Sequence, residues 1–347
     1  MDNYNQLMAG LPDTYDKRPG LLPADMMKSL SLVLDRLNTK LETATALMDI
    51  DNLSGDQLTK FVLQRTGIIR NPATYATGFV TVTGKGTINI NDMFETAGGI
   101  QFRATQMAAV NGSTSVPVKC VQLGAIGNVP ASQVTQIPVT LAGITAVTNT
   151  LPMVDGFDEE TDESLRERYY LILQTPATSG NVYHYQLWAR DVSGVGGAKV
   201  FPNSFGVNTV EVRIIDTNKL PASSGLVAAV QTYIDPDSTG LGSAVAPIGC
   251  KATILSADGK NITVSATVVK KGGYLDAVVI ANISGAIRAY FRDVAFSDPY
   301  VSYARIGECV LNAEGVADYS NLKVNDNIVN VTLGDKEVPV LVGVNLV

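Results

Sequence analysis

Apolar residues near the beginning of the chain recur in alternating steps of three and four positions. They are Met27, Leu30, Leu34, Leu37, Leu41, Ala44 and Met48. This spacing is the heptad pattern of a helix that packs against one or more partner helices. It covers about three heptads, which suits a small bundle but is marginal for an isolated coiled coil. We therefore expect residues 1–74 to be helical, with a second short helix between Ser54 and Gly67.

Two interpretations of the heptad pattern stay open. In the first, the helices fold back on one another within the chain, and the apolar positions form an internal core. In the second, the helix joins a bundle with another chain, and the same positions form an interface. The candidate interface residues are then Met27, Leu30, Leu34, Leu37, Leu41 and Met48.

Residues 75–154 show the two-residue period of β-strands instead. Pairs such as Val80 and Val82 alternate with polar or small residues. The sequence predicts turns at positions 84–86, 91–92, 98–99 and 111–112, where glycine, asparagine and aspartate gather. These features predict a compact antiparallel β domain, either a sandwich or a barrel.

The rest of the chain mixes helical and strand patterns. Helices are expected from the acidic segment to about residue 173, and at 179–192, 222–233, 275–292 and 306–312. Strands are expected at 198–201, 207–216, 262–269, 329–333 and 338–341. The fold class that follows is a multidomain α+β protein: an N-terminal helical region (1–74), a small antiparallel β domain (75–154), a central α+β domain (155–248) and a C-terminal α+β domain (249–347). In the last two domains the helices should lie on small sheets.

The charge distribution argues against two classes of partner. The net charge is −7, and the lysines and arginines form no cluster. Binding to nucleic acid or to an anionic membrane surface requires such a cluster, so we expect neither partner. The start of the chain does not resemble a signal peptide, and no apolar run is long enough to span a bilayer. With Cys120, Cys250 and Cys309 far apart, free thiols and synthesis in the cytoplasm are expected.

Candidate catalytic and metal-binding residues are few. His184 is the only histidine and lies among aromatic residues, which favours a packing or interface role. Zinc sites need clustered His and Cys ligands, and calcium loops need acids at fixed alternate positions; the chain has neither pattern. The glycines at 194–197 lack the Lys-Ser/Thr pair of a phosphate-binding P-loop. We therefore expect no cofactor, no metal and no enzymatic activity.

The acidic segment at 155–169 has the features of a turn followed by a helix start. Gly156 suits a left-handed backbone, and Asp158 or Thr161 suits the N-cap position. The following carboxylates lie where the positive end of the helix dipole favours anions. Arg166 and Arg168 come one turn later, within reach of those carboxylates.

The order of residues in this segment, Gly-x-Asp-x-Glu-Thr-Asp-Glu-x-Leu-Arg-x-Arg, resembles the signature of the baseplate J family. Four further motifs occur in the family's order. They are Arg-Asn-Pro-Ala-Thr-Tyr-Ala-Thr-Gly at 70–78, Gly-Ala-Ile-Gly-Asn-Val-Pro-Ala at 124–131, Ile-Thr-Ala-Val-Thr-Asn at 144–149 and Trp-Ala-Arg-Asp-Val-Ser-Gly-Val at 188–195. The resemblance covers roughly residues 63–201.

The resemblance implies a structural wedge protein in the baseplate of a contractile phage tail or a related injection machine. The implied partners are a second copy or a paralogue, a smaller baseplate wedge partner, a sheath-initiator-like protein and the central hub. The chain would be made in the cytoplasm of the bacterial host and end up in the virion or tail-like particle, and the baseplate would rearrange before sheath contraction. Gly78, Gly156 and Gly242 are candidate hinges for that rearrangement. The alternatives are a tail-tip protein that binds the host surface and a tail-associated hydrolase. The resemblance leaves open whether the particle is a phage, a bacteriocin-like tail or another injection device.

Overall fold

The computed structural model describes residues 3–174 and 180–346, which form two compact units at 1–69 and 70–347. The first unit is helical, as the sequence predicts. It contains α1 (Asn3–Gly10), α2 (Leu22–Ala46), the 3-10 helix η1 (Ile50–Asn52) and α3 (Gly55–Thr66). The predicted limits of the short helix are confirmed: Ser54 precedes α3, and Gly67 ends it with a left-handed backbone at φ 77°.

The 25-residue helix α2 is covered on one face and open on another. Helix α1 lies beside it, and the Asn3 amide donates a hydrogen bond to the Asp35 carboxylate. Ala24 and Ser31 are buried, whereas Met27 and Leu34 are half-buried. These four residues follow steps of three and four and therefore share one helix face.

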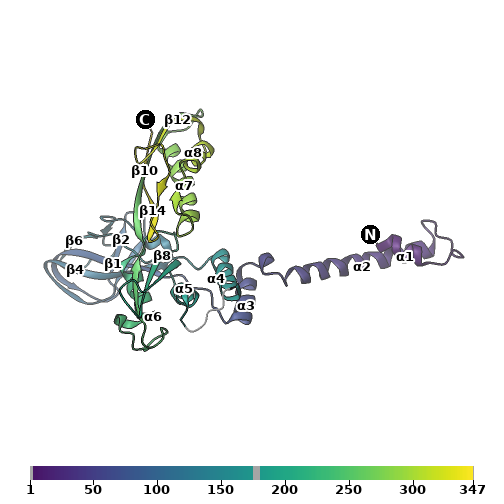
Figure 1. The fold of residues 1–347 in the computed structure, drawn as a ribbon, viewed down its shortest axis with the longest axis horizontal. Helices are drawn as coiled ribbons and strands as arrows, with labels where there is room; N and C mark the ends of the chain where they lie inside the picture. Colours follow the sequence, from purple (N-terminus) through teal and green to yellow (C-terminus); the bar gives the residue numbers. More distant parts are fainter. Residues whose placement is uncertain (1–2, 175–179, 347) are drawn as a thin grey trace. The chain divides into compact units, whose positions relative to one another are not determined.

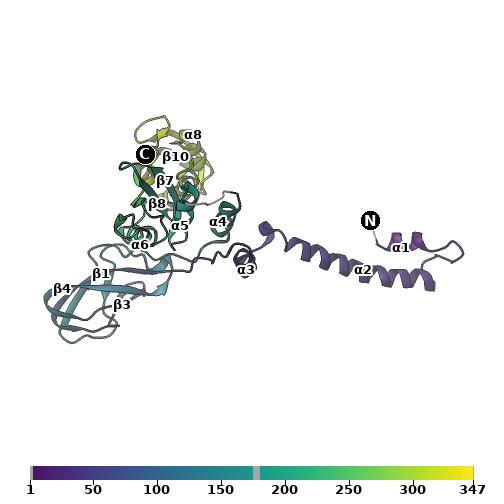
Figure 2. The ribbon, with the colours of Figure 1, turned by 60° about the horizontal axis from the view of Figure 1, so that its bottom comes forward.

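The second unit begins with a six-stranded antiparallel sheet that nearly closes into a barrel (Figure 2). Its strand order is β5-β2-β3-β4-β1-β6. The strands are β1 (Tyr75–Ile88), β2 (Met93–Thr96), β3 (Gln101–Ala104), β4 (Ala108–Leu123), β5 (Val134–Gln136) and β6 (Ile144–Thr148), and the 3-10 helix η2 (Ala125–Gly127) follows β4. Alternate side chains such as Val80, Val82, Phe94, Phe102 and Val116 fill the interior, so the barrel is packed and encloses no channel in this layer of side chains.

Two of the predicted turns in this region are wrong. Strand β1 runs straight through residues 84–86 and pairs with β4 through residues 110–112, with Gly84 opposite Gly112. The glycines serve a different purpose, because a Cβ atom at Gly84 would lie 2.2 Å from the Gly143 carbonyl oxygen. A Cβ atom at Gly86 would lie 2.3 Å from the Ala142 carbonyl oxygen. Both glycines therefore let the segment before β6 cross close to β1. The predicted turns at 91–92 and 98–99 are confirmed.

The central α+β part follows the barrel. It contains α4 (Asp162–Gln174), α5 (Val182–Arg190), β7 (Val195–Pro202), β8 (Thr209–Asp216), α6 (Ser224–Ile234), the 3-10 helix η3 (Pro236–Ser238) and β9 (Lys251–Ser256). The sheet order is β7-β8-β9, with β7 antiparallel and β9 parallel to β8. Helices α5 and α6 cover one face, where Val212, Ile214 and Val230 form a core. The predicted start of α5 at residue 179 lies outside the described residues.

The C-terminal α+β part repeats this layered design (Figure 1). It contains β10 (Asp258–Lys270), α7 (Asp276–Val294), β11 (Tyr300–Val301), α8 (Tyr303–Asn312), β12 (Val316–Val324), β13 (Val331–Thr332) and β14 (Glu337–Leu346). The main sheet has the order β12-β10-β14, with β14 parallel and β12 antiparallel to β10.

Helices α7 and α8 share one core with the C-terminal sheet. The predicted apolar stripe of α7 is buried at Val279, Ile283 and Ile287, whereas Leu275 precedes the helix and is 73% exposed. The sequence analysis missed β12. The multidomain α+β class is confirmed, and no described helix is both long and apolar enough to cross a membrane.

Candidate functional site

The sequence motifs come together where the barrel meets the central α+β part. We call this place the motif junction and define it by residues 70–77, 124–131, 149 and 153–168. It begins with Thr74, just before β1. The Thr74 amide donates to the Phe157 carbonyl at 2.8 Å, and its hydroxyl donates to the Asp155 carbonyl at 2.7 Å. The Phe157 amide donates to the same hydroxyl at 2.9 Å, so one threonine ties the barrel entry to the acidic segment.

Two asparagines complete the backbone pairing at the base of the barrel. The Asn128 side chain donates to the Gly156 carbonyl at 2.7 Å and accepts from the Gly156 amide at 2.9 Å. Asn149 is fully buried, and its Oδ1 accepts hydrogen bonds from the amides of Gln133 and Val134. Its Nδ2 donates to the carbonyls of Pro130 and Leu151. Each amide side chain thus replaces backbone partners that irregular, buried segments otherwise lack.

Gly156 occupies a confined position rather than a left-handed one. Its φ is not positive; the left-handed residue is Asp155, at φ 67°. The sequence-based assignment of the left-handed residue is therefore wrong by one position. A Cβ atom at Gly156 would lie 2.5 Å from the Gly124 carbonyl oxygen and 3.0 Å from the Ala76 Cβ. Glycine is required here because three segments meet without room for a methyl group.

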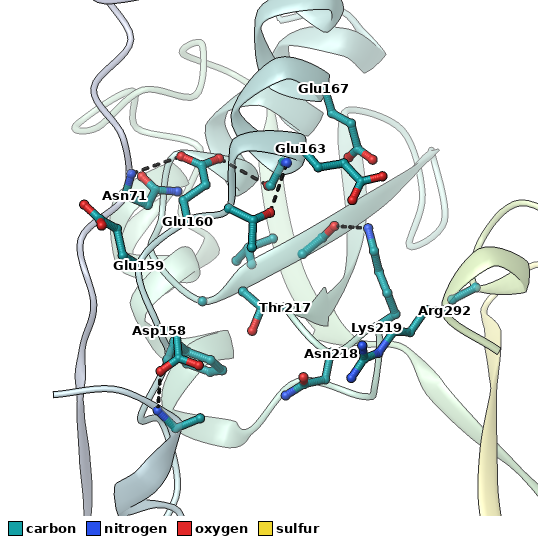
Figure 3. A pocket seen from close by; sticks show the side chains of 18 of the residues that line it. Asn71, Asp158, Glu159, Glu160, Glu163, Glu167, Thr217, Asn218, Lys219 and Arg292 are labelled. Atoms are coloured by element: carbon teal, nitrogen blue, oxygen red, sulfur yellow. Dashed lines mark hydrogen bonds between the residues drawn. The ribbon is translucent and has the colours of Figure 1, made fainter. Parts of the chain in front are cut away.

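The start of α4 resolves the choice between two capping residues. The Ser164 amide donates to the Thr161 hydroxyl at 3.2 Å, so Thr161 is the N-cap. Asp158 instead accepts a hydrogen bond from the Ala125 amide at 2.9 Å (Figure 3). The two side chains that looked equivalent in the sequence therefore have different roles. Thr161 caps the first turn of α4, whereas Asp158 binds η2.

A buried ion pair fixes α4 to the segment that precedes the barrel. Arg168 donates to Glu160 at 2.7 Å, and the two side chains are 4% and 5% exposed. Glu160 also accepts the Asn71 amide at 3.0 Å (Figure 3), and Arg168 also binds Asp191 at 2.7 Å. Removing one member of such a pair leaves an uncompensated buried charge, which costs about 3–5 kcal/mol. Glu160 and Arg168 of the motif are thus parts of one interior network.

The single histidine has a packing role, as the sequence predicts. The His184 ring stacks on Trp188 with 4.0 Å between ring centroids. Its Nδ1 accepts the Gly180 amide at 3.2 Å, and the His184 amide donates to the Asn181 side chain, which caps α5. Tyr185 packs edge-on against Trp188 and donates its hydroxyl to the Cys250 thiol at 3.3 Å. Burial, with the nearby Cys250, raises the pKa of Tyr185, so the phenol stays protonated.

A cleft of about 730 Å³ opens beside the motif junction (Figure 3). Its lining includes the carboxylates of Glu159, Glu163, Glu167 and Asp293 and the cations Lys219 and Arg292. The Lys219 amine donates to the Gly196 carbonyl at 2.7 Å. Burial lowers the pKa of Lys219, although Glu167 and Glu163 act in the opposite direction. Burial likewise raises the pKa of Asp216, at the start of the turn that carries Lys219.

The charged side chains that line the cleft are mainly carboxylates. Carboxylates outnumber cations along its wall, so its field favours positive groups. The part of the chain that the structure describes contains no group of three His, Cys, Asp or Glu side chains placed to hold a metal ion. Gly194 lies in the turn before β7, and Gly196 and Gly197 lie at the start of the strand, where a Cβ atom at Gly196 would lie 2.1 Å from the Asp216 carbonyl oxygen. The sequence predicted a structural turn, and Gly194 lies in one, whereas Gly196 permits close packing within the sheet.

The candidate interface residues on α2 do not form one uniform surface. Met27 and Leu34 are half-buried, whereas Leu30, Leu37 and Leu41 of α2 and Met48 in the turn after it are 43–76% exposed. We call these four residues the open stripe. An exposed apolar row of this length is unusual for a surface that only water contacts.

The candidate hinge glycines lie in three different settings. Gly78 is inside β1 opposite Val118, and a Cβ atom there would lie 2.4 Å from the Met153 sulfur. Gly156 lies in the motif junction. Gly242 is in the loop between η3 and β9, with φ +67°. The sequence analysis did not single out the buried Glu211 of β8, because a lone glutamate in an apolar strand has no motif around it.

Comparison with known proteins identifies the family. Models for the Baseplate J-like protein barrel domain, the Baseplate J-like central domain and the Baseplate J-like protein C-terminal domain match residues 79–156, 177–256 and 262–347. The chain is similar to the phage-like element PBSX protein XkdT of Bacillus subtilis (strain 168), with 31% identity over 96% of this chain and 92% of that protein. It is also similar to baseplate protein gp47 of Escherichia phage Mu, with 26% identity over 73% and 72% of the two chains.

Among solved structures, the baseplate of the anti-feeding prophage contains a chain with 11% identity and a TM-score of 0.39, over 97% of this chain and 89% of that one. The family models and the PBSX relative define the class, a baseplate structural protein. The chain belongs to the Baseplate J-like family, which confirms the resemblance found in its motifs.

Proposed function

We propose that this chain is a wedge subunit of a contractile-tail baseplate and that α2 joins it to a neighbouring subunit through a helical bundle. Family membership supports the baseplate role. The observation that carries the finer proposal is the open stripe, because apolar residues at heptad spacing gain free energy when a second helix covers them.

The bundle partner is a helix of another baseplate subunit: a second copy or paralogue, or the smaller wedge partner. Contacts with a sheath-initiator-like protein and with the central hub belong to the same proposal. In a closed ring, each further contact forms within an assembly that already exists, so several modest interfaces suffice. The proposal also includes the division into domains at 1–74, 75–154, 155–248 and 249–347, and the virion or tail-like particle as the final location of the chain. The absence of enzymatic activity stays a prediction.

The test places charges in the open stripe. Replacing both Leu37 and Leu41 with Asp should remove the chain from sedimenting tail particles, because two carboxylates cannot enter an apolar helix seam. The control is Thr39→Asp with Thr43→Asp, which adds the same charges about 200° away around the same helix. Mass spectrometry of the particle fraction measures incorporation and identifies the neighbouring proteins.

Three results would count against the proposal. Normal incorporation of the Leu37→Asp/Leu41→Asp chain would show that the open stripe is not an interface. Unfolding of the purified variant, seen by circular dichroism, would show that the stripe is an internal core. Binding of the wild-type chain to host cells or glycans, without tails, would favour a host-surface binding protein.

The link between host contact and sheath contraction is part of the proposal, with Gly78, Gly156 and Gly242 as candidate hinges. Of these, Gly242 has the most open surroundings, since it lies in a loop rather than in a strand or the motif junction. Alanine at a true hinge should alter contraction without preventing particle assembly.

A further inference from the structure

The face of the central sheet that lies opposite α5 and α6 carries a fully buried carboxylate. Successive residues of β8 point to opposite faces of the sheet. Val212 and Ile214 enter the core beneath the helices, so Glu211, Arg213 and Ile215 point the other way. Glu211 is 0% exposed. A buried carboxylate requires partners, since its desolvation costs several kcal/mol.

Two cations from different parts of the fold hold Glu211. The Arg213 guanidinium donates to Oε1 at 2.5 Å, and the Lys336 amine donates to Oε2 at 2.5 Å. Arg213 also donates to the Ser256 carbonyl at 2.7 Å and to the Asp258 carboxylate at 3.0 Å. Burial acts to raise the pKa of Glu211, but the hydrogen bonds from Lys336 and Arg213 outweigh it and lower the pKa. Because Lys336 precedes β14, this network joins the central part to the C-terminal part.

The apolar contact beside the network is small. Among the described residues it consists of Ile215, Ala257, Ala295 and Val338, with Phe296 packed against them. Two of these side chains are alanines, whereas each neighbouring sheet has a large core of its own. Contacts of this size within a chain resemble transient interfaces, and movement between the parts is the usual expectation.

The backbone passes between the two parts at Ala257, the residue between β9 and β10. The Ala257 amide donates to the Ile214 carbonyl at 2.9 Å, and the Asp258 amide donates to the Lys336 carbonyl at 2.9 Å. The chain therefore passes from the central sheet to the C-terminal sheet within two residues, and the second of them, Asp258, binds Arg213 of the ion network.

We propose that Glu211, Arg213 and Lys336 form a charged latch that holds the C-terminal part on the central sheet, and that opening the latch lets this part turn about Ala257. Charged groups are stable both when paired and when hydrated, whereas a large apolar face is not stable in water. An interface of charges with few apolar contacts thus has a closed and an open state of accessible free energy. The inference concerns the isolated chain and does not depend on the proposed function.

Hydrogen–deuterium exchange on the full chain tests the latch. In Glu211→Gln and in Lys336→Met, amides in residues 256–260 and 335–340 should exchange at least about tenfold faster than in the wild type, because the junction opens locally. Exchange in the barrel strands and in α7 should not change. The matched control is Lys199→Met, which breaks a rim pair with Asp335, whose side chain is 85% exposed. Such exposed pairs contribute little, so this variant should behave as wild type.

Three results would overturn the proposal. Unchanged exchange at the junction in both variants would mean that the network holds nothing closed. Equal acceleration through the barrel and both sheets would mean that Glu211 supports overall stability. The third result comes from small-angle X-ray scattering. If the radius of gyration of Glu211→Gln is unchanged despite faster exchange, the junction loosens but the C-terminal part does not turn about Ala257.

Discussion

Thr74, Asn128 and Asn149 each bind backbone groups of segments that lie far away in the sequence. Their side chains connect the acidic segment, the barrel entry and the turn after η2 by hydrogen bonds. At the scale of single residues, the family motifs therefore encode a structural junction. The three side chains satisfy backbone hydrogen-bonding groups, and Asn149, which is fully buried, binds backbone amides and carbonyls.

Gly156→Ala tests the confinement at the motif junction. We expect the free energy of unfolding to fall by about 1–3 kcal/mol, because the added methyl group overlaps the Gly124 carbonyl. Gly285→Ala is the control, since Gly285 lies in α7 with open space around it and should gain up to about 1 kcal/mol. Urea unfolding measures both. An unchanged stability of Gly156→Ala would show that the junction yields at this point and would favour the hinge prediction.

The N-terminal caps of α6 and α8 differ in what they contact. Ser223 caps α6 by accepting the Leu226 amide, and its hydroxyl also donates to the Asp155 carboxylate. Ser302 caps α8 by accepting the Arg305 amide at 3.4 Å. The first cap thus connects an element of the central part with the left-handed residue of the motif junction, whereas the second is local.

Replacing each of these serines with alanine should separate the two kinds of cap. Ser302→Ala should lower the free energy of unfolding by about 1 kcal/mol, the usual value of an N-cap. Ser223→Ala should cost about 1 kcal/mol more, because the Asp155 carboxylate also loses a charge-assisted hydrogen bond. Thermal or urea unfolding of the two variants gives the comparison. Equal losses would mean that the contact with Asp155 contributes nothing to stability.

At the scale of the whole molecule, the described part of the second unit has three large apolar cores and charged contacts between its parts. The Glu160–Arg168 pair lies between the barrel entry and α4, and the Glu211 network lies between the two sheets. Apolar burial supplies most of the stability within each core, while the ion pairs set how neighbouring parts meet.

The charged latch makes a prediction about pH. The pKa of Glu211 is lowered in the folded state, so its contribution is complete above the unfolded pKa of a glutamate, about 4.3, and is lost as the pH falls through the folded value. Glu211→Gln should therefore be less stable than wild type at pH 7. The difference should shrink below about pH 4. Urea unfolding of both chains across this range measures it, and a difference independent of pH would contradict the ionised state of Glu211.

The sequence by itself determined the fold class, the family and most helices and strands. Local periodicity carries that information, since burial of one face of a helix or strand leaves its period in the sequence. Val279, Ile283 and Ile287 of α7 illustrate this. The aromatic residues around His184 likewise predicted a packing or interface role.

Only the tertiary structure decided the matters that depend on distant segments. The glycines of β1 signalled turns, but Gly84 and Gly86 permit the close approach of residues 142–143. Thr161 and Asp158 were equivalent caps until η2 supplied the Ala125 amide. Glu211 gained its role from Lys336, which lies 125 positions later in the sequence. Such contacts join residues with no local pattern in common, so the periodicity of the chain cannot encode them.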